Sequence, residues 1–155
     1  MLDPFLTTLE QLPLAAALRG STWLYPLVNA THIIGISLLF GSIVPLDLRL
    51  AGFWPSIDLI ALRRVLLPVA IFGVVLAAGS GVLLFLPKAA DYAGSFWFLA
   101  KISLVAAGLA NALLLRRSAE WQGKGEGSWP RIAGVASLLL WTGAIVAGRL
   151  VGYFD

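Results

Sequence analysis

The stretch VLLPVAIFGVVLAAGSGVLLFLP, residues 65–87, carries no charged side chain and decides what kind of fold this chain can adopt. A helix needs about 20 apolar residues to cross a hydrocarbon core about 30 Å thick, and this stretch is long enough. Further stretches of the same character cover residues 22–46, 95–115 and 132–154. The last two are each interrupted by one cation, Lys101 and Arg149 respectively. The sequence therefore predicts an all-α, integral membrane four-helix bundle that forms a single transmembrane domain over residues 1–155.

The composition excludes several other classes of protein. Hydrophobic residues make up 59% of the chain and charged residues only 12%, whereas soluble domains carry about 25% charged residues. The chain has no cysteine, which excludes disulfides, thiolate metal sites and cysteine nucleophiles. Although the net charge is +3, the basic residues fall mostly in two predicted loops rather than on one basic face, so we expect no nucleic-acid partner.

A short amphipathic segment precedes the first predicted membrane helix. Asp3 followed by Pro4 is a favourable helix start, and several leucines make residues 4–19 apolar enough to lie along the membrane surface. Pro13 should keep this interfacial helix short or kinked. The N-terminus lacks the basic start and cleavage pattern of a signal peptide, so we expect it to be retained.

The distribution of Lys and Arg predicts the orientation. Residues 47–64 and 116–131 together hold seven of them, which are Arg49, Arg63, Arg64, Arg116, Arg117, Lys124 and Arg131. The opposite side has three, which are Arg19, Lys88 and Arg149. By the positive-inside rule, both termini lie outside, in the periplasm of a bacterium, and the chain is a multi-pass protein of the inner membrane.

Small residues recur at four-residue spacing on two of the predicted helices. Gly73, Ala77 and Gly81 share one face of the second helix, and Gly143 and Ala147 share a face of the fourth. Such rows let helix backbones approach closely in lipid, although glycine and alanine are also simply common in membrane helices. We favour close helix contact. Elsewhere, an interhelical hydrogen bond is the role we expect for Asn111.

Polar side chains form a stripe on the first membrane helix. Tyr25, Asn29 and His32 are spaced four and three residues apart, so they share one helical face, which must meet protein or water. His32 is the only histidine of the chain and lies about 15 Å below the predicted outer start of the helix. Its alternative role is a hydrogen bond to a neighbouring helix. Tyr25 and Asn29 have alternative roles as an interfacial anchor and a helix contact.

Two cations accompany this stripe in the outer half of the predicted bilayer. Lys101 lies roughly 9 Å from the outer end of its helix, and Arg149 lies about one turn from the end of the last helix. No acidic residue is expected at the same depth. Histidine and cations without an acidic partner suit an anionic or electron-rich ligand, such as haem propionates, a quinone head group or a lipid phosphate. Alternatively, Lys101 and Arg149 extend to the headgroups as snorkelling side chains.

One histidine limits the possible cofactor chemistry. Haem b requires either coordination by His32 alone, a second subunit, or Lys101 as the other ligand, because the only methionine is Met1. His32 is also the one candidate metal ligand, but copper(I) prefers Cys and Met, which the membrane segments lack. A Ser-His-acid triad is not supported, since no acid is expected near His32.

Several motifs carry a resemblance to known families. They are HIIGISLLFGSIVPLDLRL (32–50), RVLLP (64–68), FWFLAK (96–101), NALL (111–114) and GRLVGY (148–153). Together they resemble a functionally uncharacterised family of small bacterial four-helix membrane proteins. The pattern is also similar to copper-resistance D-type membrane domains and, more distantly, to the four-helix membrane protoporphyrinogen oxidase. This resemblance implies a haem or porphyrin site with His32 and Lys101, supported by Asn111. Leu115 and Arg116 stand where another histidine would be expected, which argues against a two-histidine site.

The sequence thus predicts a site in the outer half of the bilayer that binds haem or a quinone for electron transfer. We weigh two other functions: a non-catalytic accessory subunit of a larger membrane complex, and a metal-handling or transport module like the copper-resistance relatives. The expected partners are the lipid bilayer and either further copies of this chain, in a homo-oligomer, or a larger membrane complex.

Overall fold

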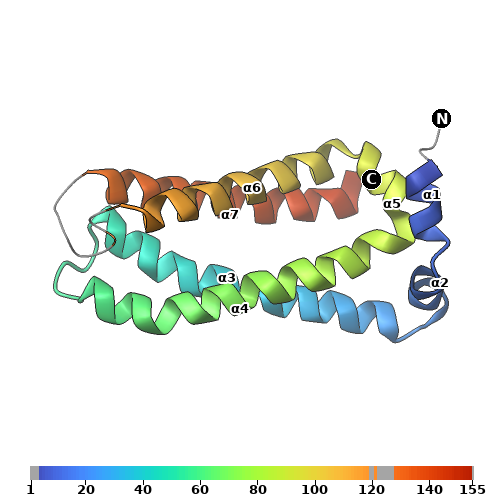
Figure 1. The fold of residues 1–155 in the computed structure, drawn as a ribbon, viewed down its shortest axis with the longest axis horizontal. Helices are drawn as coiled ribbons and strands as arrows, with labels where there is room; N and C mark the ends of the chain where they lie inside the picture. The colour runs from blue at the N-terminus through green and yellow to red at the C-terminus, as the bar shows by residue number, and fades with distance from the viewer. Residues whose placement is uncertain (1–3, 119–120, 122–127, 155) are drawn as a thin grey trace.

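The computed structural model describes residues 4–118, 121 and 128–154, whose regular elements are all helices. In chain order these are α1 (Pro4–Glu10), α2 (Pro13–Gly20), α3 (Leu24–Ala51), α4 (Leu59–Phe85), the 3-10 turn η1 (Leu86–Lys88), α5 (Ala89–Gly94), α6 (Phe96–Arg116) and α7 (Trp129–Phe154). Four stretches are long and apolar enough to cross a membrane: α3, α4 with η1 and α5, α6, and α7. They lie side by side as a bundle (Figure 1). The predicted all-α membrane fold is confirmed over the described residues.

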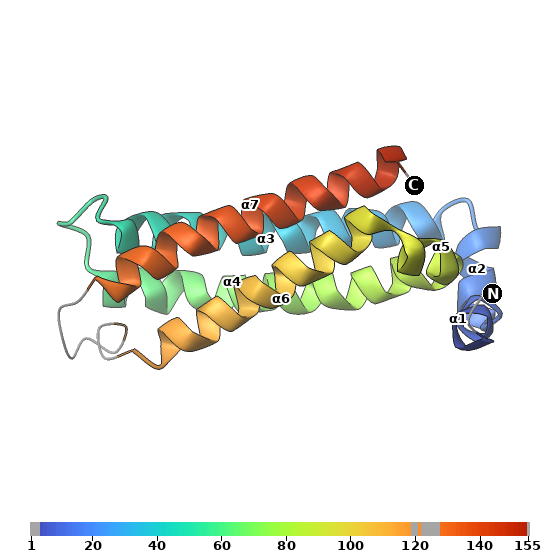
Figure 2. The same cartoon turned by 90° about the horizontal axis from the view of Figure 1, so that it is seen from above.

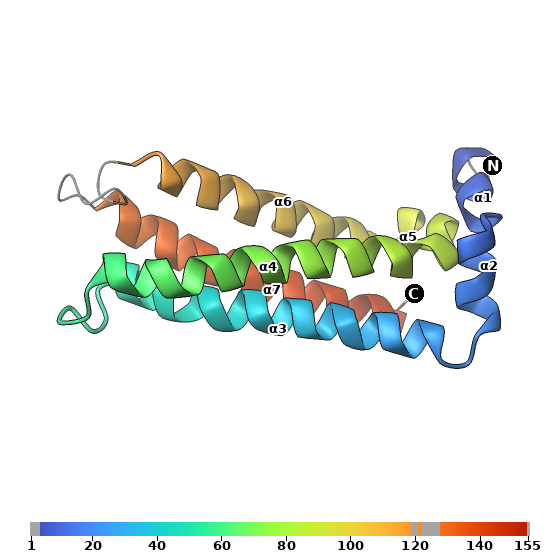
Figure 3. The same ribbon diagram turned by 60° about the horizontal axis from the view of Figure 1, so that its bottom comes forward.

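The two ends of the bundle differ in what they carry. α1, α2 and α5 gather at one end, where α7 also finishes, and we call this the terminal end (Figures 1 and 3). The opposite end, which we call the loop end, carries the connection of residues 52–58 between α3 and α4. The position of each candidate site residue is therefore defined by the end of the bundle to which it is nearer.

At the loop end, α3 and α4 extend beyond the predicted membrane segments. α3 continues five residues past Leu46 to Ala51, and α4 begins at Leu59, six residues before the predicted Val65. Gly52 ends α3 with a φ of +107°, a left-handed conformation that glycine adopts without strain. Asp58 begins α4 by accepting a hydrogen bond from Ile60 N at 2.9 Å. These caps place Asp47 within a helix, although the sequence placed it at the start of a loop.

The N-terminal segment forms two helices, because the chain turns between Glu10 and Pro13. They cross the terminal end of the bundle, roughly perpendicular to its long axis (Figure 3). The Arg19 guanidinium donates to Glu10 O at 2.6 Å and to Pro87 O at 3.2 Å. Glu10 Oε1 accepts a hydrogen bond from Ala90 N at 2.9 Å. These contacts fix the segment to the connection between α4 and α6.

α3 and α4 approach closely at two glycines. A Cβ atom at Gly73 would lie 2.5 Å from Leu39 N and 2.8 Å from Gly35 O, and one at Gly35 would lie 2.6 Å from Ala77 N. These neighbours are backbone atoms, so a side chain could be accommodated only if the helices moved apart. The predicted contact through the row of small residues on α4 is confirmed.

α7 packs against both α3 and α6 through small residues (Figure 2). A Cβ at Gly134 would lie 2.7 Å from Asp47 O of α3, and one at Gly143 would lie 3.3 Å from Leu104 Cδ1 of α6. The predicted contact through the Gly143 face is confirmed. Asn111 Nδ2 donates to Ala133 O at 2.9 Å, so the interhelical hydrogen bond predicted for Asn111 is confirmed too.

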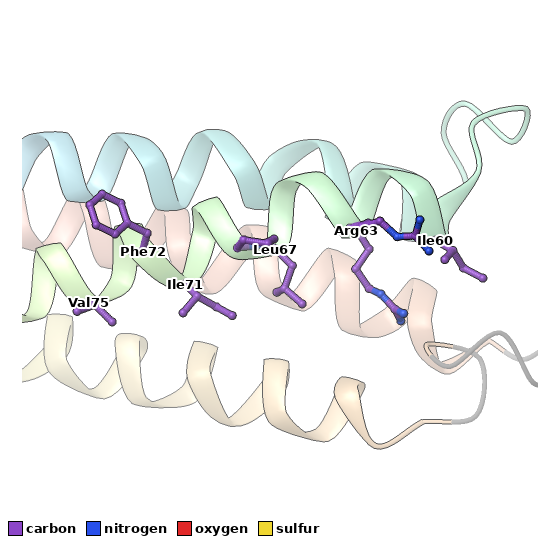
Figure 4. Close-up of a pocket in the computed structure, with 8 residues that line it drawn as sticks. Ile60, Arg63, Leu67, Ile71, Phe72 and Val75 are labelled. Atoms are coloured by element: carbon purple, nitrogen blue, oxygen red, sulfur yellow. The ribbon is translucent and has the colours of Figure 1, made fainter.

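An open groove runs along α4 (Figure 4). It is lined by Ile60, Arg63, Arg64, Leu67, Pro68, Ile71, Phe72 and Val75, and has a volume of about 610 Å³. Arg63 does not extend freely into it, because its guanidinium bonds Trp121 O and lies 5.0 Å from the centre of the Trp121 ring. The groove includes none of the predicted site residues, which lie elsewhere in the bundle.

Candidate functional site

His32 lies in the third turn of α3, toward the terminal end, and is half-buried against α4. Its Nδ1 lies 2.8 Å from Ala77 O and 3.2 Å from Ser80 Oγ. A Cβ at Gly81 would lie 3.1 Å from His32 Cε1, so the absence of a side chain at Gly81 makes room for the imidazole. The ring is therefore held in one orientation by Ala77, Ser80 and Gly81, which lie within about one turn of each other on the neighbouring helix.

The contact with Ala77 decides which nitrogen of His32 carries hydrogen. A backbone carbonyl oxygen can only accept a hydrogen bond, so Nδ1 must carry the proton. Ser80 Oγ directs its own hydrogen to Leu76 O at 2.5 Å and is therefore able to accept from Nδ1 as well. In the neutral ring this leaves the lone pair on Nε2. No described residue forms a hydrogen bond with Nε2, so its lone pair is not occupied by a donor from the described part of the protein.

Lys101 of α6 is the second polar group on the terminal half of the bundle. Its side chain lies against Gly148 of α7, where a Cβ would be 3.2 Å from Lys101 Cδ and 3.6 Å from Nζ. The ammonium is close enough to His32 for the two groups to interact electrostatically. No described residue accepts a hydrogen bond from Nζ, which is not fully enclosed. His32 of α3 and Lys101 of α6 therefore lie within electrostatic range of each other, and no direct contact joins them among the described residues.

The other three predicted site residues lie outside this pair. Tyr25 and Asn29 lie on exposed parts of α3, two turns and one turn from His32 toward the terminal end. Arg149 is exposed too, and its Nη2 lies 3.0 Å from Tyr153 OH, with the guanidinium 4.7 Å from the centre of the Tyr153 ring. Arg149 is thus held by a residue one turn away on its own helix. The described contacts give none of the three a direct interaction with His32.

Asp47 is a buried acidic residue that the sequence analysis did not identify as part of a site. The sequence predicted a connection over residues 47–64, which begins at Asp47, but this residue lies in the last two turns of α3, only 4% exposed. The Ser137 hydroxyl of α7 interacts with its carboxyl group, and Oδ2 has no hydrogen-bond partner among the described residues. The signal for this position was Gly52, a C-cap residue five positions further on that predicts continued helix past Asp47.

In the described part of the chain, the predicted site offers His32 as a single potential ligand rather than a cluster of ligands. Within the described part of the chain, no three His, Asp or Glu side chains gather to hold a metal. Haem iron needs only one or two protein ligands, and an imidazole that donates its other nitrogen to a carbonyl is the usual form of such a ligand. His32 has this arrangement.

The four apolar helices make this chain a multi-pass membrane protein. Compared with models of protein families, with curated proteins and with solved structures, the chain matches nothing. The resemblances drawn from the sequence motifs therefore stay predictions, and the argument for function depends on the residues themselves.

Proposed function

We propose that this protein binds a b-type haem within the membrane, with His32 Nε2 as an iron ligand, and takes part in electron transfer. The observation that carries the proposal is the 2.8 Å contact between His32 Nδ1 and Ala77 O, which puts the proton on Nδ1 and leaves the lone pair on Nε2. Hydrogen bonding at Nδ1 fixes the ring orientation and increases the basicity of the ligating nitrogen. A haem bound here would supply one-electron transfer.

Lys101 has a separate role in the proposal. Its ammonium is a cation without an acidic partner among the described residues, so it would attract the carboxylate of a haem propionate. The same ammonium could donate to a quinone carbonyl, and the Nε2 lone pair could accept a hydrogen bond from a quinol hydroxyl. A quinone is therefore the competing occupant, and the experiment must distinguish it from haem.

The proposed orientation places the loop end in the cytoplasm and the terminal end in the periplasm of a bacterial inner membrane. The described cations support it. Those near the loop end are Arg49, Arg63, Arg64, Arg116, Arg117 and Arg131, whereas Arg19, Lys88 and Arg149 lie near the terminal end. Positively charged residues are retained on the cytoplasmic side during insertion. In this orientation, His32 and Lys101 lie in the periplasmic half of the bilayer.

The test is the visible spectrum of the protein, purified in mild detergent and recorded oxidised and dithionite-reduced. We expect a Soret band and a reduced α-band that are lost in His32→Ala. The matched control is Ser37→Ala, on the same helix, because Ser37 is exposed and its hydroxyl bonds only Ile33 O at 2.9 Å. This control should keep the spectrum of the unmodified protein.

Three results would contradict the proposal that haem is bound by His32. A featureless spectrum together with quinone in the solvent extract, lost in both His32→Ala and Lys101→Ala, would identify a quinone site. A featureless spectrum with no extracted quinone and a stoichiometric co-purifying membrane protein would instead support an accessory subunit. Bands that persist in His32→Ala would show that haem is bound elsewhere.

A further inference from the structure

Asp47 stands apart from the site at His32. The two residues are on the same helix, fifteen positions apart, which corresponds to about 22 Å along its axis. Asp47 lies near the loop end, about one and a half turns before the C-cap Gly52. Ionisable residues within membrane helices are costly and usually functional, so this buried carboxyl group needs an explanation.

Among the residues that the structure describes, Asp47 has no charged partner. The cations on the neighbouring elements are engaged elsewhere or exposed. Arg49 of α3 bonds Ile57 O and Pro55 O, Arg63 of α4 bonds Trp121 O, Arg64 of α4 is exposed, and Arg131 of α7 is exposed beside Gly52. The group that acts on the Asp47 carboxyl is the neutral hydroxyl of Ser137. A carboxylate here would be a buried charge without a counter-ion.

The close contact between α3 and α7 leaves this carboxyl group little exposed to water. A Cβ at Gly134 would lie 2.7 Å from Asp47 O and 3.0 Å from Leu50 Cβ, so the two helices touch at this level. Ser137, one turn further along α7, is only 6% exposed. Burying an unpaired carboxylate costs several kcal/mol, whereas a protonated carboxyl group avoids that cost.

We propose that Asp47, with Ser137, is a proton-binding site at the loop end of the bundle. A hydronium ion at the loop end gives up the proton: one of its O–H bonds breaks to leave water, an O–H bond forms on a carboxylate oxygen, and the buried negative charge disappears. This inference does not depend on haem or quinone binding at His32.

The ligand set favours a proton over a metal ion. Calcium takes six to eight oxygen ligands and magnesium requires an octahedron, whereas the described residues offer one carboxyl group and one hydroxyl. No group of three His, Asp or Glu side chains forms here in the described part of the chain. A proton needs a single oxygen.

Carbodiimide labelling tests the proposal, because dicyclohexylcarbodiimide reacts with protonated carboxyl groups and enters apolar sites. The full-length protein in mild detergent would be labelled at neutral and alkaline pH, and the label located by mass spectrometry of peptides. We expect labelling of Asp47 at neutral pH, less labelling at alkaline pH, and its loss in Asp47→Asn. Asparagine has the shape of a protonated aspartate, so this variant should fold.

Asp58→Asn is the matched control, since Asp58 is an exposed carboxylate at the same end of the bundle and asparagine caps a helix equally well. It should leave labelling unchanged. Infrared spectra should show a protonated-carboxyl C=O band that Asp47→Asn removes and Asp58→Asn keeps. Absence of both the label and the band from the unmodified protein would overturn the proposal. Protection from labelling by sodium chloride, but not by choline chloride, would overturn it in favour of a sodium ion.

Discussion

The contact between α3 and α4 makes a sharp prediction about Gly73. In Gly73→Ala the new methyl carbon would lie 2.5 Å from Leu39 N, about 0.9 Å closer than the 3.4 Å at which ordinary contact begins. Because Leu39 N and Gly35 O belong to the backbone, neither can rotate away, and α3 and α4 must separate. A gap of 0.5–1 Å loses roughly a quarter to a half of the dispersion energy of each atom pair at the crossing.

We expect Gly73→Ala to lower the free energy of unfolding by about 1–3 kcal/mol, the usual range for overpacking. The matched control is Gly79→Ala on the same helix, where a Cβ has no neighbour within 4 Å. That control should be neutral or slightly stabilising, because alanine is the better helix former. Thermal unfolding in detergent would measure both, with a shift of about 2–4 °C per kcal/mol. Equal midpoints for the two variants would refute the packing argument.

Three further predictions concern other described contacts. Asn111→Ala should lower the free energy of unfolding by about 0.6–2 kcal/mol through loss of the hydrogen bond to Ala133 O. The control Asn29→Ala, at an exposed position, should change this free energy little. Similar losses in both variants would contradict the interhelical hydrogen bond. Arg149→Gln should leave the visible spectrum unchanged, because Arg149 bonds Tyr153 on its own helix; a lost Soret band would place Arg149 in the cofactor site. Ser80→Ala should keep the haem but raise its midpoint potential, measured by redox titration. The reason is that one hydrogen-bond acceptor at His32 Nδ1 is removed, so the imidazole becomes a less basic ligand. An unchanged potential would show that Ser80 does not act on the site.

The sequence predicts the helices well, because a hydrocarbon core demands long uncharged segments and tolerates no other regular structure here. The row through Gly73 and Gly81 also predicts a close helix contact correctly. The helix ends are harder to predict from the sequence. Asp47 beside Arg49 looks like the start of a polar loop, but the Gly52 cap and the contact with α7 keep it in a buried helix.

The surroundings of His32 show where prediction from sequence stops. The spacing of Tyr25, Asn29 and His32 identifies a shared face, but it does not say what the imidazole meets. Its partner is a backbone oxygen, Ala77 O, which has no signature in the sequence. Only the register of α3 on α4, set by the contact of Gly35 with Gly73, brings that carbonyl to the ring.

The reduced-minus-oxidised difference spectrum of the purified protein, compared with that of His32→Ala, is the decisive measurement for haem ligation by His32. We expect a Soret band and an α-band in the unmodified protein, absent from His32→Ala and retained in the exposed control Ser37→Ala. An identical spectrum in all three proteins, whether featureless or showing haem, would contradict the assignment of a haem to His32.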